Sequence, residues 1–270
     1  MSVKHCFILV EGQQDILFIG RLVQSLGVPS VENVEEISSV WSPLIDTSRL
    51  TEHRGRLKTG SSGLPMHVLF SGACFQSEQH SVVIQKAGGR GDLFRRTLRS
   101  MNTLLDGGLQ GLGAVGLIPD SDDDPIAIRQ SCEQILKDIN LSTPIRPANV
   151  AYGKPNTGIY TLPRPTDCGA TEDLMLDCAQ LIYPTLHAAA IQFVDSVEKT
   201  CPPFEAVDLM EINGPHGRSK AVVGCISSFL RPGSTIQVSL LRDRWVSRNT
   251  VSLPRIQELV SFLKSLCELA

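Results

Sequence analysis

An acidic run stands where a buried strand is expected to end. From Gly113 to Pro125 the sequence reads GAVGLIPDSDDDP, so a short apolar run precedes Asp120 and Asp122. Pro125 and the apolar residues after it are typical of the first turn of a helix, which puts the aspartates in the loop between strand and helix. Carboxylates at this density repel one another unless a cation lies among them, and a divalent metal is the leading candidate. The alternative is that they only cap the turn and complement the helix dipole.

Acidic side chains recur at two further junctions between a strand and a helix. Glu11 follows an apolar run at residues 3–10, and Asp15 falls in the first turn of the helix after it. Thr171 is the expected N-cap of a later helix, so Glu172 and Asp173 fall in its first turn. Each pair alone is explained by dipole complementation or a solvated strand end. Because ligands bind at the carboxyl ends of strands in open α/β sheets, we expect all three junctions to meet at one edge.

Positive charge is concentrated in two places. Residues 86–92 read KAGGRGD between an expected strand and helix, and a glycine-rich turn of this kind lets backbone amides approach an anion. Lys220 lies near the start of a later helix, where a positive charge opposes the helix dipole and indicates a negative group nearby. The alternatives are a tight turn with a solvated helix face, and a solvated lysine. The expected phosphate contacts are Lys86, Arg90, Arg95, Arg96, Arg99 and Arg218.

The elements that position these residues alternate between strand and helix. We expect strands at 3–10, 81–85, the apolar run after Gly113, and 158–163. Residues 30–79 are rich in Ser, Thr, Gly and Pro and form an expected insertion after the first helix, either a lid, a partner surface or a small hairpin. Residues 200–270 are expected as a helical C-terminal extension of the same domain. The expected helices are 15–23, 93–105, 126–139, one beginning near 171, 183–199, 219–230 and 254–269.

Composition limits the class of protein. The chain has 270 residues, 42% of them hydrophobic, and a net charge of −3, so it lacks the global basic field that announces nucleic acid, and any polyanion site must be local or assisted by a metal. Its eight cysteines form no Cys-x-x-Cys pair and are expected to be reduced. A strand begins within a few residues of the N-terminus, and no apolar run approaches the roughly 20 residues that span a bilayer. We therefore expect a cytoplasmic protein with no membrane contact.

The acidic motifs resemble those of the Toprim domain of topoisomerases, primases and overcoming-lysogenisation-defect (OLD) nucleases. The resemblance is carried by Glu11-Gly12 after the first strand, Asp15 at the OLD-type spacing, and Asp120-Ser121-Asp122 after a later strand. It covers most of the chain outside 30–79, and the chain also looks like small stand-alone bacterial Toprim-related proteins. It implies a Rossmann-like α/β fold, a mainly parallel sheet flanked by helices. No Gly-x-x-x-x-Gly-Lys-Ser/Thr loop occurs, so an OLD-like activity needs a separate ATPase subunit or none.

The resemblance also implies an activity, hydrolysis of phosphodiester bonds in DNA or RNA with two Mg²⁺ or Mn²⁺ ions. One ion is expected on Glu11, Asp120 and Asp122, and the other on Asp15 with Glu172 or Asp173. The catalytic residues would then be Glu11, Asp120, Asp122 and Lys220, with Lys220 stabilising charge at phosphorus. The company that OLD-like nucleases keep suggests a role in antiphage defence or DNA repair, and the oligomeric state is left open.

Two other functions compete with the nuclease. An Asp-x-Asp phosphatase that uses an aspartyl nucleophile fits poorly, because its motif follows the first strand and Asp120 comes much later. A Toprim module without catalysis, acting as a sensor or partner subunit whose acids bind metal weakly, remains the main alternative.

Overall fold

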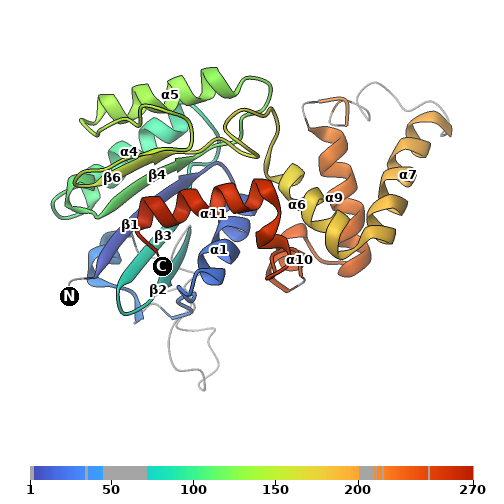
Figure 1. Cartoon of the computed structure of the whole chain (residues 1–270), viewed down its shortest axis with the longest axis horizontal. Coiled ribbons are helices and arrows are strands. Elements are labelled where there is room, and N and C mark those ends of the chain that lie inside the picture. The colour runs from blue at the N-terminus through green and yellow to red at the C-terminus, as the bar shows by residue number, and fades with distance from the viewer. Residues whose placement is uncertain are drawn as a thin grey trace, which may run out of the picture.

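A six-stranded mixed sheet forms the centre of the protein (Figure 1). The computed structural model describes residues 3–33, 36–44, 72–200, 210, 212–214, 216–242 and 244–269. The sheet order is β2-β3-β1-β4-β6-β5, in which β3, β1, β4 and β6 run parallel while the edge strands β2 and β5 are antiparallel to their neighbours. The strands are β1 (Lys4–Val10), β2 (Gly72–Gln76), β3 (His80–Lys86), β4 (Ala114–Ile118), β5 (Val150–Ala151) and β6 (Asn156–Ile159).

Helices cover both faces of the sheet. Side chains of β1 alternate between the two faces, because successive residues of a strand point in opposite directions. Cys6, Ile8 and Val10 face the layer that contains α1 and α11, whereas Phe7 and Leu9 face α4 and α5. The helices are α1 (Gln13–Ser25), α4 (Asp92–Leu104), α5 (Pro125–Asp138), α6 (Thr171–Ile182), α7 (Pro184–Thr200), α9 (Gly217–Leu230), α10 (Ile236–Arg242) and α11 (Pro254–Cys267), with 3-10 turns η2 (Ser39–Leu44), η3 (Leu109–Gly111) and η4 (Thr250–Ser252).

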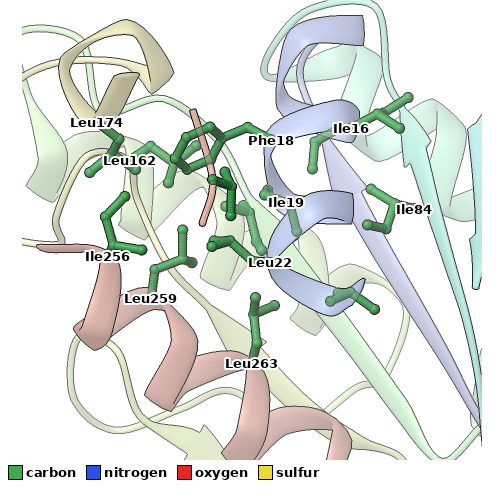
Figure 2. Close-up of a cluster of buried hydrophobic side chains, with 14 of the residues drawn as sticks. Ile16, Phe18, Ile19, Leu22, Ile84, Leu162, Leu174, Ile256, Leu259 and Leu263 are labelled. Carbon is green, nitrogen blue, oxygen red and sulfur yellow. The ribbon is translucent and has the colours of Figure 1, made fainter. Parts of the chain in front are cut away.

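The C-terminal helix belongs to the main core. Figure 2 shows Leu259 and Leu263 of α11 packed towards Phe18 and Leu22 of α1. At the sheet surface α11 lies directly over β4, where Gly116 leaves no room for a side chain beside the leucine at position 266. Helices α7 and α9 pack against each other away from the sheet (Figure 1). Residues 200–270 therefore contribute both to the sheet layer and to this outer helical part.

The expected α/β fold, with a mainly parallel sheet between helices, is confirmed. The last residues of the expected insertion at 30–79 form β2, an edge strand that pairs antiparallel with β3, in agreement with the small hairpin that was one of the three alternatives. Trp41 of η2 is also fully buried, and its indole N–H donates to Ser81 Oγ over 2.8 Å. The last part of this segment thus belongs to the sheet, and Trp41 of η2 packs into the core beside it. Residues 45–71, with the short apolar run near 66–70, lie outside the described residues.

Within the described residues, no helix combines the length and the apolar character that a bilayer crossing requires.

Candidate functional site

The strand register brings the first two acidic junctions to one edge of the sheet. Val10, the last residue of β1, pairs with Lys86 on one side and with Ile118 on the other. Glu11 directly follows Val10, and Asp120 lies two residues beyond Ile118. Because these strands are parallel, both carboxylates leave the sheet at the same end.

The third acidic junction reaches the same edge through α6. Thr171, the first residue of that helix, donates its backbone N–H to Asp120 Oδ1 over 3.1 Å. The expected N-cap is therefore off by one residue, since Ala170 is the N-cap and Thr171 already belongs to the helix. The expectation that three junctions meet at one edge is confirmed.

A cleft of about 440 Å³ opens at this edge. Four carboxylates line it, from Glu11, Asp15, Asp120 and Glu172, which are four of the six expected metal ligands. The rest of its wall is made of two lysines, three glutamines and three glycines: Lys86, Lys220, Gln13, Gln14, Gln237, Gly12, Gly88 and Gly89. The cleft is thus lined by acidic, polar and positively charged residues.

Asp15 and Asp120 are tied together through Thr171. The hydroxyl of Thr171 donates to Asp15 Oδ1 over 2.5 Å, while the backbone N–H of Thr171 donates to Asp120 Oδ1. The other oxygen of Asp15, Oδ2, accepts the backbone N–H of Gly12 over 2.8 Å and so closes the first turn of α1. Asp15 is only 5% exposed. One carboxylate therefore caps α1 and also fixes the start of α6 against it.

Burial raises the pKa of all four carboxyl groups. Burial raises the pKa of Glu11 from 4.5 to about 7, although the positive charge of Arg90 lowers it. The pKa of Asp120 lies well above its usual range, first through burial and then through repulsion by Asp15, Glu11 and Glu172. Burial also raises the pKa of Asp15 and Glu172, in spite of the lowering effect of Lys220 on both. Burial is thus the first cause of each raised pKa, and at Asp120 repulsion among the carboxylates adds to it.

The donor set suits a hard divalent cation. Mg²⁺ and Mn²⁺ prefer carboxylate oxygens, and Glu11 Oε1 is a buried oxygen that accepts no hydrogen bond from the described residues. The side chains are not preorganised as ligands, because within the described ranges no three His, Cys, Asp or Glu residues converge as a metal-binding group. Both oxygens of Asp15 already accept hydrogen bonds from the protein. Glu11, Asp120 and Glu172 are therefore the residues best placed to hold a cation.

Asp122, the second aspartate of the Asp-x-Asp motif, does not line the cleft. It adopts a left-handed backbone conformation with φ of 44°. Its carboxylate forms an ion pair with Arg90 and lies 3.5 Å from His216 Nε2. The structure therefore does not bring Asp122 to the expected first metal position beside Glu11 and Asp120, because the turn aims its side chain at Arg90 instead.

Asp173 is also held outside the cleft lining. Its Oδ2 accepts the backbone N–H of Ala170 over 2.9 Å, and its Oδ1 accepts the hydroxyl of Ser219 over 3.0 Å. It repeats at α6 the capping role that Asp15 has at α1. Of the two neighbouring acids that we considered for the second ion, only Glu172 faces the cleft.

The expected phosphate contacts are dispersed. Lys86 lines the cleft, and Arg90 lies beside it with Nε 3.8 Å from Glu11 Oε1. On α4, Arg96 and Arg99 are exposed, while Arg95 is paired with Asp92 at 2.8 Å and with Asp138 at 3.2 Å. Arg218 is engaged by Asp195 of α7 through two hydrogen bonds. Lys220 lines the cleft as expected.

Four residues of the site were missed by sequence reasoning. Thr171 was expected only as a cap, and its link between two carboxylates depends on a contact across 156 positions of the chain. Gln13 and Gln14 begin α1 directly after Glu11-Gly12, so their closeness to the motif was a signal that could have found them. Gln237 lies on α10, a helix that we did not expect, and no sequence signal pointed to it.

The fold and the site define an α/β protein with an acidic cleft at the carboxyl edge of its parallel strands. A family model described as "Protein of unknown function (DUF3226)" matches residues 6–268, so the chain belongs to this family. Among solved structures, the crystal structure of hypothetical protein PH0156 from Pyrococcus horikoshii OT3 is similar, with a TM-score of 0.44 and 14% sequence identity. That alignment covers 98% of this chain and 95% of the other. No curated protein matches the chain.

Proposed function

We propose that the protein is a metal-dependent nuclease of the Toprim type, which hydrolyses phosphodiester bonds of nucleic acid in the cleft. One observation carries this proposal. Four carboxylates with raised pKa values share one cleft with Lys86 and Lys220, so side chains that would hold a cation and side chains that would bind a phosphate line the same cleft. The resemblance to Toprim motifs rests on Glu11-Gly12, Asp15 and Asp120-Ser121-Asp122, and of their acidic residues Glu11, Asp15 and Asp120 line this cleft while Asp122 does not.

The carboxylates, the lysines and the nearby arginines have different roles in the proposed reaction. Glu11, Asp120 and Glu172 would hold Mg²⁺ or Mn²⁺, which when bound supplies Lewis-acid stabilisation of the phosphate charge and an activated water. Lys86 and Lys220 would bind the phosphate oxygens through charge-assisted hydrogen bonds. The exposed Arg96 and Arg99 of α4 would contact phosphates farther along the strand.

A second candidate function is a Toprim-related module without catalysis, which binds a cation weakly and serves as a sensor or partner subunit. The arrangement of the ligands favours it, since no three of the described His, Cys, Asp or Glu side chains converge as ligands. Both oxygens of Asp15 are engaged by Gly12 and Thr171, so a second ion would have to break those hydrogen bonds. Such a module would bind at most one ion and leave nucleic acid uncut.

Cleavage of supercoiled plasmid and of single-stranded RNA, with Mg²⁺ or Mn²⁺, tests the proposal. We expect cleavage by the native protein and its loss in Asp120→Asn, which keeps the shape of the side chain and removes its charge. Asp123→Asn is the matched control, because Asp123 belongs to the same acidic run but is exposed and lies outside the cleft. Cleavage that survives Asp120→Asn would contradict the nuclease, whereas metal binding without any cleavage would favour the module.

A further inference from the structure

Arg90 lies beside the acidic cleft, on a loop whose backbone conformation depends on glycine. It lies between β3 and α4, where Gly88, Gly89 and Gly91 have φ values of 84°, 142° and 57°. These are backbone conformations that residues with a side chain rarely adopt. From this loop the guanidinium of Arg90 reaches Asp122 as an ion pair, with its Nε 3.8 Å from Glu11 Oε1.

Asp122 is itself fixed from two sides. Its backbone N–H donates to Gly169 O over 2.9 Å, and its own carbonyl accepts the N–H of Gly169 over 2.8 Å. Its carboxylate lies between Arg90 and His216, and His216 is the N-cap of α9, the helix that carries Lys220. Asp122 therefore connects the glycine-rich loop to the start of α9, and both segments contribute residues to the lining of the cleft.

We propose that Arg90 is the resident counter-charge of the acidic cleft, held there by Asp122, and that a divalent cation must displace it to bind at Glu11. This inference rests on the proposed function, because it concerns the regulation of the same site. It also assigns the second aspartate of the Asp-x-Asp motif a positioning role in place of the metal ligation that we expected.

Electrostatics and geometry both support this assignment. The Nε of Arg90 lies 3.8 Å from Glu11 Oε1, so the guanidinium already provides part of the positive charge that a cation would supply there. About half of the Arg90 side chain is exposed, at 47%, so it can swing into solvent without leaving a cavity. A guanidinium and a divalent cation near one carboxylate repel each other, so the two compete for Glu11.

Calorimetric titration with Mn²⁺ tests this competition on the full chain without measuring cleavage. We expect Arg90→Gln to bind Mn²⁺ about five- to tenfold more tightly than the native protein. The effect is modest because solvent screens the charge of the partly exposed guanidinium. Arg90→Lys, which keeps the charge, should bind less tightly than Arg90→Gln. Lys137→Gln on α5 removes an equal charge from an exposed position outside the cleft and should leave the Mn²⁺ affinity unchanged.

A second measurement examines the counter-charge in the absence of metal. In EDTA, Arg90→Gln should lower the midpoint of thermal unfolding by several degrees, and this effect should be largely lost when Glu11→Gln and Asp122→Asn are already present. If Arg90→Gln lowered the unfolding midpoint equally in the native protein and in the protein that carries Glu11→Gln and Asp122→Asn, the role of Arg90 as counter-charge would be overturned. If Arg90→Gln left Mn²⁺ binding unchanged or weakened it, the proposal that the cation must displace Arg90 would be overturned, and the proposed function would stand. If neither protein binds Mn²⁺, the displacement and the proposed function both fail.

Discussion

Replacing Glu11 by glutamine should stabilise the metal-free protein, and only where Glu11 is ionised. Glu11 carries a buried oxygen for which the described part of the chain offers no hydrogen-bond donor, and burial raises the pKa of Glu11 to about 7. Glutamine keeps the shape of the side chain but carries no charge that burial would penalise. The variant should therefore unfold at a higher temperature than the native protein at pH 8.5.

The size and the sign follow from the pKa of Glu11. Its pKa in the folded protein, about 7, exceeds the value of 4.5 of the free side chain, so between these pH values the folded chain binds more protons than the unfolded chain. Stability from this group is thus fully present below pH 4.5 and is lost as the pH rises through 7. At about 1.4 kcal/mol per pKa unit the loss amounts to about 3 kcal/mol, which corresponds to a rise of roughly 5–10 °C in the unfolding midpoint of Glu11→Gln at pH 8.5.

Thermal unfolding in EDTA at pH 5 and at pH 8.5 provides the measurement. Glu78→Gln, on the exposed turn between β2 and β3, is the matched control and should leave the midpoint unchanged at both pH values. The reasoning would be refuted if Glu11→Gln gave no stabilisation at pH 8.5, or gave the same stabilisation at pH 5, because either result would show that the buried charge of Glu11 does not oppose folding.

Three further changes test other parts of the site. Thr171→Val removes the hydroxyl that donates to Asp15 and should destabilise the protein by about 2 kcal/mol in urea unfolding. Gly169→Ala should cost about 2 kcal/mol or more by the same measurement, because φ is 143° there and a Cβ would collide with Asp173. Lys220→Gln should weaken binding of a single-stranded oligonucleotide and reduce the slope of log affinity against log salt by about 0.7, and an unchanged slope would exclude a phosphate contact.

The sequence predicted the central sheet because its strands carry a strong pattern. The runs after Lys4 and Gly113 are apolar on both faces, as buried parallel strands are, and they became β1 and β4. Strand β2 reads GACFQ and lies at the sheet edge, so its pattern is weak, and only its pairing with β3 holds it in the sheet. Helix α10 has seven residues, too few for a helical period to stand out.

The site was predictable as far as the backbone determines it, and side-chain direction set the limit. Parallel strands carry Glu11 and Asp120 to one edge whatever their rotamers, so their meeting followed from topology. Asp122, which lies beyond the end of β4, itself adopts a left-handed backbone conformation, and nothing in an Asp-x-Asp pattern specifies that turn. Asp173 stands at the third position of its helix, where an acid commonly caps the first turn, so a capping signal was present and we gave it too little weight.

The capping positions also explain how the cleft tolerates its charge. Asp15 occupies in α1 the position that Asp173 occupies in α6, and each accepts a backbone N–H at the start of its own helix. The helix dipole favours a negative charge there, which offsets part of the desolvation that raises the pKa of Asp15. Asp120 has a single backbone donor, from Thr171, and a pKa well above its usual range. Capping thus offsets part of the cost of burying Asp15, whereas Asp120, which follows a strand, lacks the favourable position at the start of its own helix.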